Sequence, residues 1–431
     1  MKNVGKNDVL RNQNGAFTVI YKIVWRIFLL SVSIPCLIAV MNFLAWRLAD
    51  KRLVPDENVE FLPSYGYKRN PDDPYWTLNI NAVVFRSGKS DHFKNIFLDT
   101  MVSFFSRYNE YDTSTLRTRL SIFLRDFQRG KFIYMSVCSK DPELHSVRCK
   151  STEDVITLLS IGPTQEDGLV NSKLRISFDE KNLNQKEVYV HLYDDRITSF
   201  SDSEKYNRMA SVTLIPYDGI SVVSDIDDTI KVTNVGNLVK VLEATFVNNF
   251  TAVHEISEMY KYWLWRMNGS IHFHYVSSSP WLFANLLSDW IKMTKLPTGS
   301  MHLRKFRFEF EPWGVDFSLF SLLKNPTEYK ISKIKDILRE FPGRKFVLVG
   351  DSSEKDPEIY GHITREYPDQ IICSLIRNCP HNSIDRVDPK RLERAFFDVP
   401  STKYGLVSVE SSRKGTFFDI HSMMKSNSCV M

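Results

Sequence analysis

The pattern of hydrophobic and polar positions changes at about residue 216, and the change predicts two domains of different kinds. In the first part, runs of alternating or β-branched residues are separated by polar turns, as is typical of strands. The predicted strands read WTLNINAVVF, KFIYMSV, KLRISF, KEVYVHLY and MASVTLIP. Residues 93–108 and 115–130, between the first two runs, carry helical patterns. We therefore expect a mostly β accessory domain over residues 76–215, with a helical insert.

The second part alternates short apolar runs with amphipathic helical patterns. The predicted strands read ISVVS, HFHYV, FVLVG and QIICSLIR. This alternation predicts an α/β fold with a parallel sheet covered on both faces, and we expect it over residues 216–385. A polar, proline-containing linker is expected at residues 55–75 and a C-terminal tail at residues 386–431. In folds of this kind the ligand site lies at the carboxyl ends of the strands.

The N-terminal segment, residues 1–54, has a different pattern. Residues 27–46 are 20 positions without a charge, about the length that a helix needs to cross a bilayer, and Trp25 and Trp46 flank them as interfacial anchors would. Basic residues outnumber acidic ones before this stretch, which favours that end on the cytosolic side, although further basic residues follow it and leave the orientation open. We expect a single-pass membrane protein of the endoplasmic reticulum. The basic start is also typical of mitochondrial targeting, which is the alternative.

The composition adds limits to this picture. A hydrophobic content of 43% with 25% charged residues is typical of a globular protein. A net charge of +5 without a long basic block argues against nucleic acid as a partner and suits an anionic membrane or a phosphate-bearing substrate. The six cysteines include no C-x-x-C pair and are interpreted as mostly reduced structural thiols. Two glycosylation acceptor patterns, at Asn249 and Asn268, are too common by chance to decide the compartment.

The densest group of acidic residues follows the first strand of the α/β part. In VVSDIDDTIKV, residues 222–232, Asp225, Asp227 and Asp228 stand within four positions. Like charges this close raise one another's pKa, so such a group is usually built around a cation. Asp225 and Asp227 are two residues apart on the loop that leaves the strand and can point into one pocket. Asp228 is expected to start a helix or to support the site rather than to bind a ligand.

Further candidates follow other predicted strands. Ser277 comes after HFHYV, and Asp351 and Asp356 come after FVLVG, so all of them are expected at the same edge of the sheet. Several carboxylates around one point suit Mg²⁺, which prefers oxygen ligands. The sequence therefore predicts a magnesium site at this edge.

These residues also provide the parts of a phosphoryl-transfer reaction. A carboxylate such as Asp225 can attack phosphorus and form an aspartyl-phosphate. Asp227 can protonate the leaving oxygen and later activate water. Ser277 and Lys330 can hold the phosphoryl oxygens, whose negative charge needs fixed donors and a cation.

Four motifs in this order resemble the pattern of the haloacid dehalogenase (HAD) phosphohydrolases: D-x-D-x-T behind a strand, a serine after the next strand, a lysine opening a helix, and GDSSEKD. Longer stretches are similar to the catalytic domain of the fungal actin-patch phosphatidate phosphatase family over roughly residues 210–380. They read LIPYDGISVVSDIDDTIKVTNV, FHYVSSSPWLF, GSMHLRKF and FPGRKFVLVGDSSEKDPEIYGHI. The resemblance implies a HAD-like Rossmannoid three-layer domain and a Mg²⁺-dependent conversion of phosphatidate to diacylglycerol.

The resemblance also implies a role for each matching residue. Asp225 would be the nucleophile and Asp227 the acid and base, while Thr229, Ser277 and Lys330 would bind the substrate. The metal ligands would be Asp225, the backbone carbonyl of Asp227, and Asp351, with Asp356 behind them. The chain departs from the family where Tyr329, rather than a histidine, precedes the motif lysine, and it has no long proline-rich tail that would recruit actin-patch partners. Protein partners therefore stay open.

Two other functions remain possible at this point. The same chemistry could act on another lipid phosphate or on a soluble phosphomonoester. The chain could also be a membrane-tethered binding module with a vestigial phosphatase site. The presence of all four motifs favours an enzyme, and we expect a phosphatidate phosphatase that works at a membrane.

Overall fold

The computed structural model describes residues 52–430 with internal gaps, the longest being 87–94, 104–112, 141–153, 194–208, 317–325, 380–388 and 409–416. The chain divides into two compact units, Met1–Leu53 and Val54–Met431, and all described helices and strands belong to the second. The predicted membrane helix at residues 27–46 lies outside the described residues. Within the described part of the chain, no helix is long and apolar enough to cross a membrane.

The first part of the unit is a mixed sheet. Eight strands of the described residues form it in the order β3-β2-β1-β8-β7-β4-β5, with β6 paired to β2. They are β1 (Glu57–Tyr67), β2 (Trp76–Arg86), β3 (Asp126–Phe127), β4 (Ile133–Cys138), β5 (Val155–Ile161), β6 (Leu169–Ile176), β7 (Glu187–Leu192) and β8 (Met209–Ile215). All five strands that the sequence predicts here are present. Helix α3 (Thr113–Phe123) forms part of the expected helical insert.

Strand β1 corrects the predicted linker at residues 55–75. It lies within that stretch, pairs antiparallel with β2 and parallel with β8, and is largely buried along its length. The stretch reads as a linker because Glu57 and other polar residues interrupt its apolar pattern. In the structure Glu57 lies 3.1 Å from Arg86 and 3.0 Å from Lys131, so its charge is compensated inside the sheet. A strand whose acidic residues find partners far along the chain is hard to recognise from local pattern.

The second part of the unit contains the predicted parallel sheet. Its six strands among the described residues run parallel in the order β11-β10-β9-β14-β15-β16. They are β9 (Gly219–Ser224), β10 (His272–Pro280), β11 (Gly299–Arg304), β14 (Arg344–Asp351), β15 (Ile371–Arg377) and β16 (Tyr404–Val407), and a separate hairpin joins β12 (Glu309–Glu311) to β13 (Gly314–Asp316). Strand β16 comes from the expected C-terminal tail, which therefore extends the sheet.

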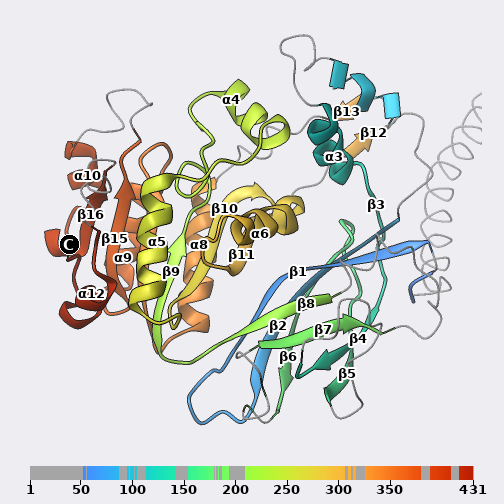
Figure 1. Ribbon diagram of the computed structural model, residues 1–431, viewed down its shortest axis with the longest axis horizontal. Helices are drawn as coiled ribbons and strands as arrows, with labels where there is room; N and C mark the ends of the chain where they lie inside the picture. The colour runs from blue at the N-terminus through green and yellow to red at the C-terminus, as the bar shows by residue number, and fades with distance from the viewer. Residues whose placement is uncertain are drawn as a thin grey trace, which may run out of the picture. The chain divides into compact units, whose positions relative to one another are not determined.

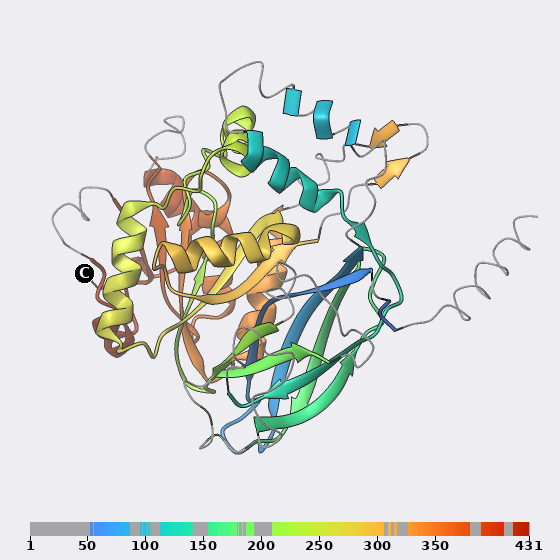
Figure 2. The same cartoon turned by 45° about the vertical axis from the view of Figure 1, so that its right-hand side comes forward.

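Helices cover both faces of this sheet because its strands are apolar on both sides (Figure 1; Figure 2). Val222 packs in the core cluster with α5 and α6, whereas its neighbour Val223 packs in the cluster with α8 and α9. Successive side chains of a strand point to opposite faces, so β9 contributes to both cores. The helices of this part are α4 (Leu238–Leu242), the π-helix η4 (Glu243–Val247), α5 (His254–Arg266), α6 (Ala284–Met293), α8 (Pro326–Glu340), α9 (Asp356–Glu366), α10 (Pro389–Ala395) and α12 (Ile420–Ser426).

The cysteines also differ from the prediction. Cys373 on β15 forms a disulfide with Cys429, which lies 56 positions further along the chain, and Cys138 is disulfide-bonded as well. Among the described residues Cys379 is free, and it is buried. The interpretation of mostly reduced thiols is therefore wrong for this part of the chain. Spacing gave no sign of the pairing, because the folding of the C-terminal residues back onto β15 brings the two cysteines together.

Candidate active site

The site begins where the central strand of the parallel sheet ends. Strand β9 is buried between β10 and β14, and Asp225 follows it directly with 2% of its surface exposed. The backbone N–H of Asp225 donates to the carbonyl of Val349 at 2.9 Å, which fixes the residue beside the end of β14. Ser277 lies near the end of β10 and Asp351 ends β14. The structure thus places the predicted residues at one edge of the sheet.

Three carboxylates form a buried cluster at this edge. One oxygen each of Asp225, Asp351 and Asp356 lies within 4.8 Å of the others. Asp356 begins α9, and its Oδ2 accepts the backbone N–H of Asp351 at 3.3 Å. Gly350 allows this approach, because a Cβ at that position would collide with the carboxylate of Asp356. Thr229 Oγ1 donates to Asp225 at 3.3 Å and to Asp351 at 3.4 Å.

Lys330 is the ammonium group within this cluster. It comes from the first turns of α8, is 2% exposed, and its Nζ lies 2.9 Å from Asp225 Oδ1 and 2.7 Å from Asp356 Oδ1. Burial alone would lower the pKa of Lys330, but Asp225 and Asp356 outweigh it and raise that pKa. A surface position is the default for a lysine on an amphipathic helix, so its burial here indicates a specific role.

One ammonium does not balance three carboxylates. Burial raises the pKa of Asp225 well above its usual range, and Lys330 only partly opposes this. Burial and the neighbouring Asp356 likewise raise the pKa of Asp351 to about 7. Without another cation, the cluster would hold protons near neutral pH. An oxygen-only, negatively charged group of this kind fits a hard cation such as Mg²⁺.

Asp227 lies in a separate group of donors. Its Oδ1 accepts from Lys231 Nζ at 2.6 Å and from Thr233 Oγ1 at 2.7 Å. Its Oδ2 accepts from Ser279 Oγ at 2.6 Å and from Ser277 Oγ at 3.2 Å. Burial alone would raise the pKa of Asp227, but the charge of Lys231 and these hydrogen bonds lower it below its usual range. Asp227 is therefore ionised, in contrast to Asp225 and Asp351, whose pKa values are raised.

Lys231, Thr233 and Ser279 were not predicted as site residues. Lys231 and Thr233 stand in the same short stretch as Asp227, at spacings of four and six residues, and Ser279 is the last of three consecutive serines. The serine cluster was the one visible signal. The contacts of Lys231 and Thr233 depend on how the loop after β9 turns back, which local pattern does not give.

Asp228 supports the loop and does not start a helix. Its carboxylate accepts the backbone N–H groups of Thr233, Asn234 and Val235 at 2.9, 2.7 and 2.7 Å. Its backbone has φ 56°, a left-handed conformation that aspartate tolerates better than most residues. Its carbonyl accepts from Arg377 Nη1 at 2.8 Å. Of the two roles expected for Asp228, the structure shows support of the loop and no helix start.

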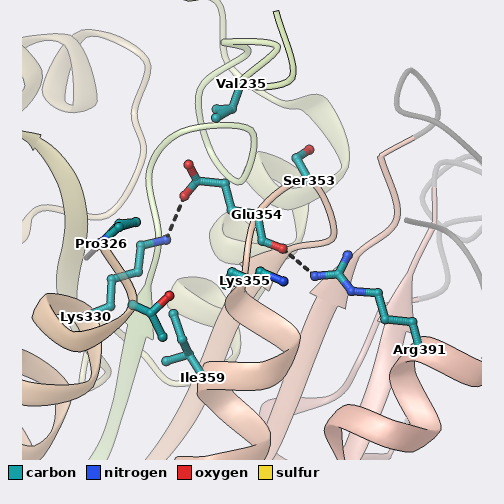
Figure 3. Close-up of a pocket in the computed structure, with 9 residues that line it drawn as sticks. Val235, Pro326, Lys330, Ser353, Glu354, Lys355, Ile359 and Arg391 are labelled. Atoms are coloured by element: carbon teal, nitrogen blue, oxygen red, sulfur yellow. Dashed lines mark hydrogen bonds and ion pairs between the residues drawn. The ribbon is translucent and has the colours of Figure 1, made fainter. Parts of the chain in front are cut away.

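A cavity of about 380 Å³ opens beside Lys330 (Figure 3). In Figure 3, Lys330 and Glu354 point toward each other, and their charged atoms are 3.5 Å apart. Arg391 of α10 closes another side, where it donates to the carbonyl of Ser352 at 2.7 Å and pairs with Glu358 at 2.8 Å. The cavity is lined by Val235, Pro326, Thr327, Lys330, Ser353, Glu354, Lys355, Ile359 and Arg391.

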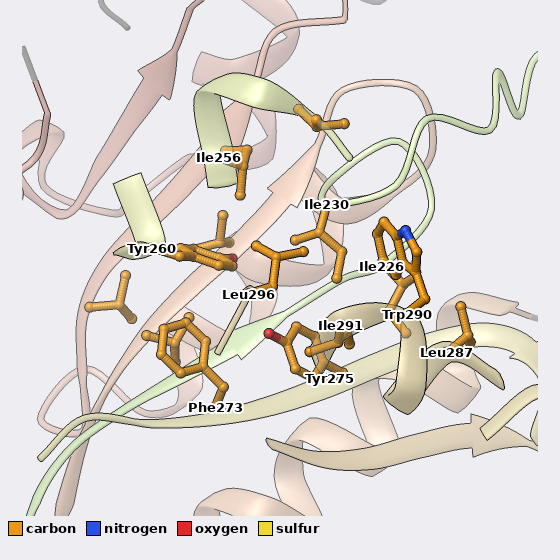
Figure 4. Close-up of a cluster of buried hydrophobic side chains, with 14 of the residues drawn as sticks. Ile226, Ile230, Ile256, Tyr260, Phe273, Tyr275, Leu287, Trp290, Ile291 and Leu296 are labelled. Atoms are coloured by element: carbon orange, nitrogen blue, oxygen red, sulfur yellow. The ribbon is translucent and has the colours of Figure 1, made fainter. Parts of the chain in front are cut away.

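Apolar residues anchor the loop that carries the aspartates. Ile226 stands between Asp225 and Asp227, and Ile230 follows Thr229. Both isoleucines are fully buried and belong to the core cluster shown in Figure 4. Tyr260 of α5 packs in the same cluster and donates to Ser224 Oγ at 2.8 Å, just before the loop. Packing against the core and the hydrogen bonds of Asp228 thus hold the loop, and they fix the positions of Asp225 and Asp227.

Comparison with known proteins agrees with this geometry. Residues 220–378 match the family model described as the catalytic domain of phosphatidate phosphatase APP1. Over these residues the chain is similar to that catalytic domain. The chain is 33% identical over 183 residues to phosphatidate phosphatase APP1 of Saccharomyces cerevisiae. It is 32% identical over 174 residues to an uncharacterized protein of Schizosaccharomyces pombe.

Each of these two matches covers 39% of this chain and 27% of the relative. The chain therefore spans about a quarter of the length of the curated relatives that it matches. The family predicted from the four motifs is confirmed, and the APP1-like segment contains every predicted site residue from Asp225 to Asp356.

Proposed function

We propose that this chain is a Mg²⁺-dependent phosphatidate phosphatase that works through an aspartyl-phosphate at Asp225. The observation that carries the proposal is the buried, undercompensated carboxylate cluster at the edge of a parallel sheet, inside an APP1 catalytic-domain segment. The helices on both faces of that sheet support a HAD-like Rossmannoid assignment for this domain.

The residues of the cluster fit a magnesium ion. Asp225, Asp351 and Asp356 supply oxygen ligands, to which we add the backbone carbonyl of Asp227, and the raised pKa values of Asp225 and Asp351 indicate that the cluster lacks positive charge. When bound, Mg²⁺ would supply the charge that stabilises the phosphoryl oxygens and keeps Asp225 ionised.

The attack is made by the carboxylate of Asp225. One of its oxygens forms a bond to phosphorus while the bond from phosphorus to the glycerol oxygen breaks. Lys330 lies 2.9 Å from this carboxylate, so it can hold a phosphoryl oxygen next to the nucleophile. The hydroxyl of Ser277, which donates to Asp227 in this structure, would donate to a phosphoryl oxygen of the bound substrate. Thr229 donates to the carboxylate of Asp225 and holds its orientation.

Asp227 handles the proton in both steps. In the first step it gives a proton to the departing diacylglycerol oxygen, and in the second it takes one from the water that attacks the aspartyl-phosphate. Its ionised resting state suits the second step. Because Asp227 is ionised at rest, it must first take up a proton from solvent before it can give one to the leaving oxygen. The negative charge of an incoming phosphate raises the proton affinity of Asp227 and favours this uptake.

The dimensions of the cavity support a substrate whose tails stay outside. A volume of about 380 Å³ is at the small end of ligand pockets, enough for a phosphate headgroup and not for two acyl chains. A lipid that presents only its headgroup would leave its chains in the bilayer. We place the enzyme at a membrane, anchored through residues 27–46, in the endoplasmic reticulum rather than in mitochondria.

The test is phosphate release by the purified chain from phosphatidate in liposomes, compared with other lipid phosphates and with sugar phosphates. We expect release from phosphatidate that requires Mg²⁺ and falls at least about 10³-fold in Asp225→Asn, which keeps the shape but removes the attacking charge. Faster release from sugar phosphates would assign a soluble substrate instead. Failure of well-folded protein to hydrolyse any phosphomonoester would leave a vestigial site.

A further inference from the structure

Disulfide bonding is the first of two observations that point to a compartment. Of the four cysteines in the described part of the chain, Cys138, Cys373 and Cys429 are disulfide-bonded. The fourth, Cys379, is buried. Cytosolic glutathione keeps thiols reduced, so structural disulfides persist mainly in secreted proteins and in the lumen of the endoplasmic reticulum. This pattern is that of a domain that folds in an oxidising compartment.

The bond between Cys373 and Cys429 belongs to a specific arrangement of the C-terminal residues. Trp263 Nε1 of α5 donates to the carbonyl of Phe418 at 2.6 Å, and Met423 of α12 is fully buried against the same core. The N–H of Cys429 donates to the carbonyl of Thr402 at 2.6 Å. Several independent contacts thus hold Cys429 against β15. The disulfide joins two cysteines that packing already brings together.

The second observation is the exposure of both glycosylation acceptors. Asn249 and Thr251 of the first pattern are exposed on the loop between η4 and α5. Asn268 and Ser270 of the second pattern are exposed in the turn after α5. An N-linked glycan needs an asparagine side chain that faces solvent, with a hydroxyl residue two positions on.

Space around the acceptors suits the modification. Within the described chain neither asparagine side chain has a hydrogen-bond partner, so neither is needed to hold its loop. Asn268 has φ 47°, and a Cβ at Gly269 would meet nothing within 4 Å. The backbone of the first loop is fixed by the N–H of Val232, which donates to the carbonyl of Thr251 at 2.9 Å. Both glycans would therefore project from well-defined turns into solvent.

We infer that residues 54–431 fold in the lumen of the secretory pathway, where the Cys373–Cys429 disulfide forms and Asn249 and Asn268 carry N-linked glycans. If the chain crosses the membrane once with its basic N-terminus in the cytosol, residues 54–431 lie on the lumenal side. The inference does not depend on the proposed phosphatase activity. It selects the lumenal leaflet as the surface that the site faces and excludes the mitochondrial alternative.

The experiment uses the full chain produced in eukaryotic cells, with electrophoretic mobility measured before and after treatment with peptide N-glycosidase F. We expect a faster-moving band after treatment. Asn249→Gln and Asn268→Gln should each remove one step of the shift, and the double variant should remove all of it. Thr251→Ser and Ser270→Thr are the matched controls, since they alter the same loops but keep the acceptor pattern, and they should retain both steps.

The disulfide is tested on the same cells by alkylation before lysis, followed by non-reducing peptide mass spectrometry. We expect a peptide pair that links Cys373 to Cys429. Wild-type protein that shows no glycosidase-sensitive shift, or whose Cys373 is alkylated before lysis, would overturn the inference. A shift that survives in the double asparagine variant would also overturn it. The wild-type measurements need no variant to fold.

Discussion

The two sheets of the molecule differ in how the charges of their buried carboxylates are compensated. In the mixed sheet, the side chain of Glu57 is fully buried and lies 3.1 Å from Arg86 and 3.0 Å from Lys131. Glu60, which is 10% exposed, lies 2.5 Å from Arg125. Each acid there has at least one cation of its own. In such pairs the charge of the buried acid is compensated by its neighbour, so no net charge is left for a ligand to compensate.

At the edge of the parallel sheet, by contrast, Asp225, Asp351 and Asp356 share Lys330. The pKa of Asp225 is raised well above its usual range and that of Asp351 is raised to about 7, in both cases mainly by burial. The balance of charge, and not the presence of buried acids, therefore separates a structural pair from a candidate metal and phosphate site.

After the loss of the nucleophile Asp225, the largest expected effect concerns Asp227. In Asp227→Asn, attack by Asp225 remains possible, but the proton donor and the base for the second step are lost, which lowers turnover of phosphatidate by about 10²–10⁴-fold. An aryl phosphate has a good leaving group and needs no proton. With that substrate we expect a burst of aryl alcohol, then a slow steady state, measured by stopped-flow absorbance.

The protein in that slow phase should carry phosphate that hydroxylamine removes. Wild-type turnover of the aryl phosphate is the control, because the pocket must first be shown to admit it. Equal slowing of both substrates without a burst would contradict the role of Asp227 as acid and base.

The next effect is on stability. Lys330→Met leaves the buried carboxylates of Asp225 and Asp356 without their ammonium group, and breaking a buried pair in this way costs about 3–5 kcal/mol. Lys335, which lies on the same helix as Lys330, forms a partly exposed pair with Glu366 of α9, and Lys335→Met should cost about 1 kcal/mol or less. Denaturant unfolding at neutral pH measures both. Similar losses for the two variants would contradict the buried-charge account.

The pH dependence of that loss has a definite sign. Asp351 has a folded-state pKa of about 7, raised by burial and Asp356, above the unfolded value near 3.9. The folded cluster therefore binds more protons than the unfolded chain, and the removal of Lys330 extends this. Removal of the Lys330 charge raises the folded-state pKa of Asp351 further, while its unfolded pKa is the same in both proteins. The loss of stability in Lys330→Met should therefore be full above the raised pKa and should shrink as the pH falls toward about 7. A deficit that grows on acidification would be inconsistent with this.

A smaller effect is expected in the mixed sheet. Glu57→Gln removes the buried carboxylate that Arg86 and Lys131 share, while Arg86 keeps its pair with Asp56 at 3.2 Å, and should destabilise the fold by about 1–3 kcal/mol. Because Glu57 belongs to a closed group, Mg²⁺ affinity and phosphatase turnover should stay unchanged. Urea unfolding and initial rates in liposomes measure the two properties. A fall in Mg²⁺ affinity in this variant would show that the charge of Glu57 affects the carboxylate cluster of the parallel sheet, contrary to the account.

Much of the fold could be predicted from local pattern, and the exceptions share a cause. The strands of the parallel sheet from β9 to β15 are apolar and short, apart from β11, and the alternation with helices identified them. Strand β1 was missed because its acidic residues are paired with residues far along the chain. The pairing of Cys373 with Cys429 was missed for the same reason, since a separation of 56 residues carries no local signal.

The candidate site was predicted where sequence order maps directly onto the sheet. Asp225, Ser277 and Asp351 lie at or near strand ends, so the rule for parallel sheets brings them together. Lys231 and Arg391 were missed because a turning loop and the C-terminal region deliver them. The three backbone hydrogen bonds of Asp228 were not predicted, because they depend on a left-handed backbone conformation that the sequence pattern does not indicate.

The most direct test of the central claim is the titration of Mg²⁺ into the purified chain by calorimetry, without substrate, at pH 6 and pH 8 in buffers of different ionisation enthalpy. Because Asp351 has a pKa of about 7, Mg²⁺ must displace a proton, and affinity should rise with pH by up to about tenfold per unit. Asp351→Asn should lose the proton release and most of the affinity, while Glu57→Gln should keep both. Equal Mg²⁺ binding by wild type and Asp351→Asn, with no proton exchange in either, would contradict the account.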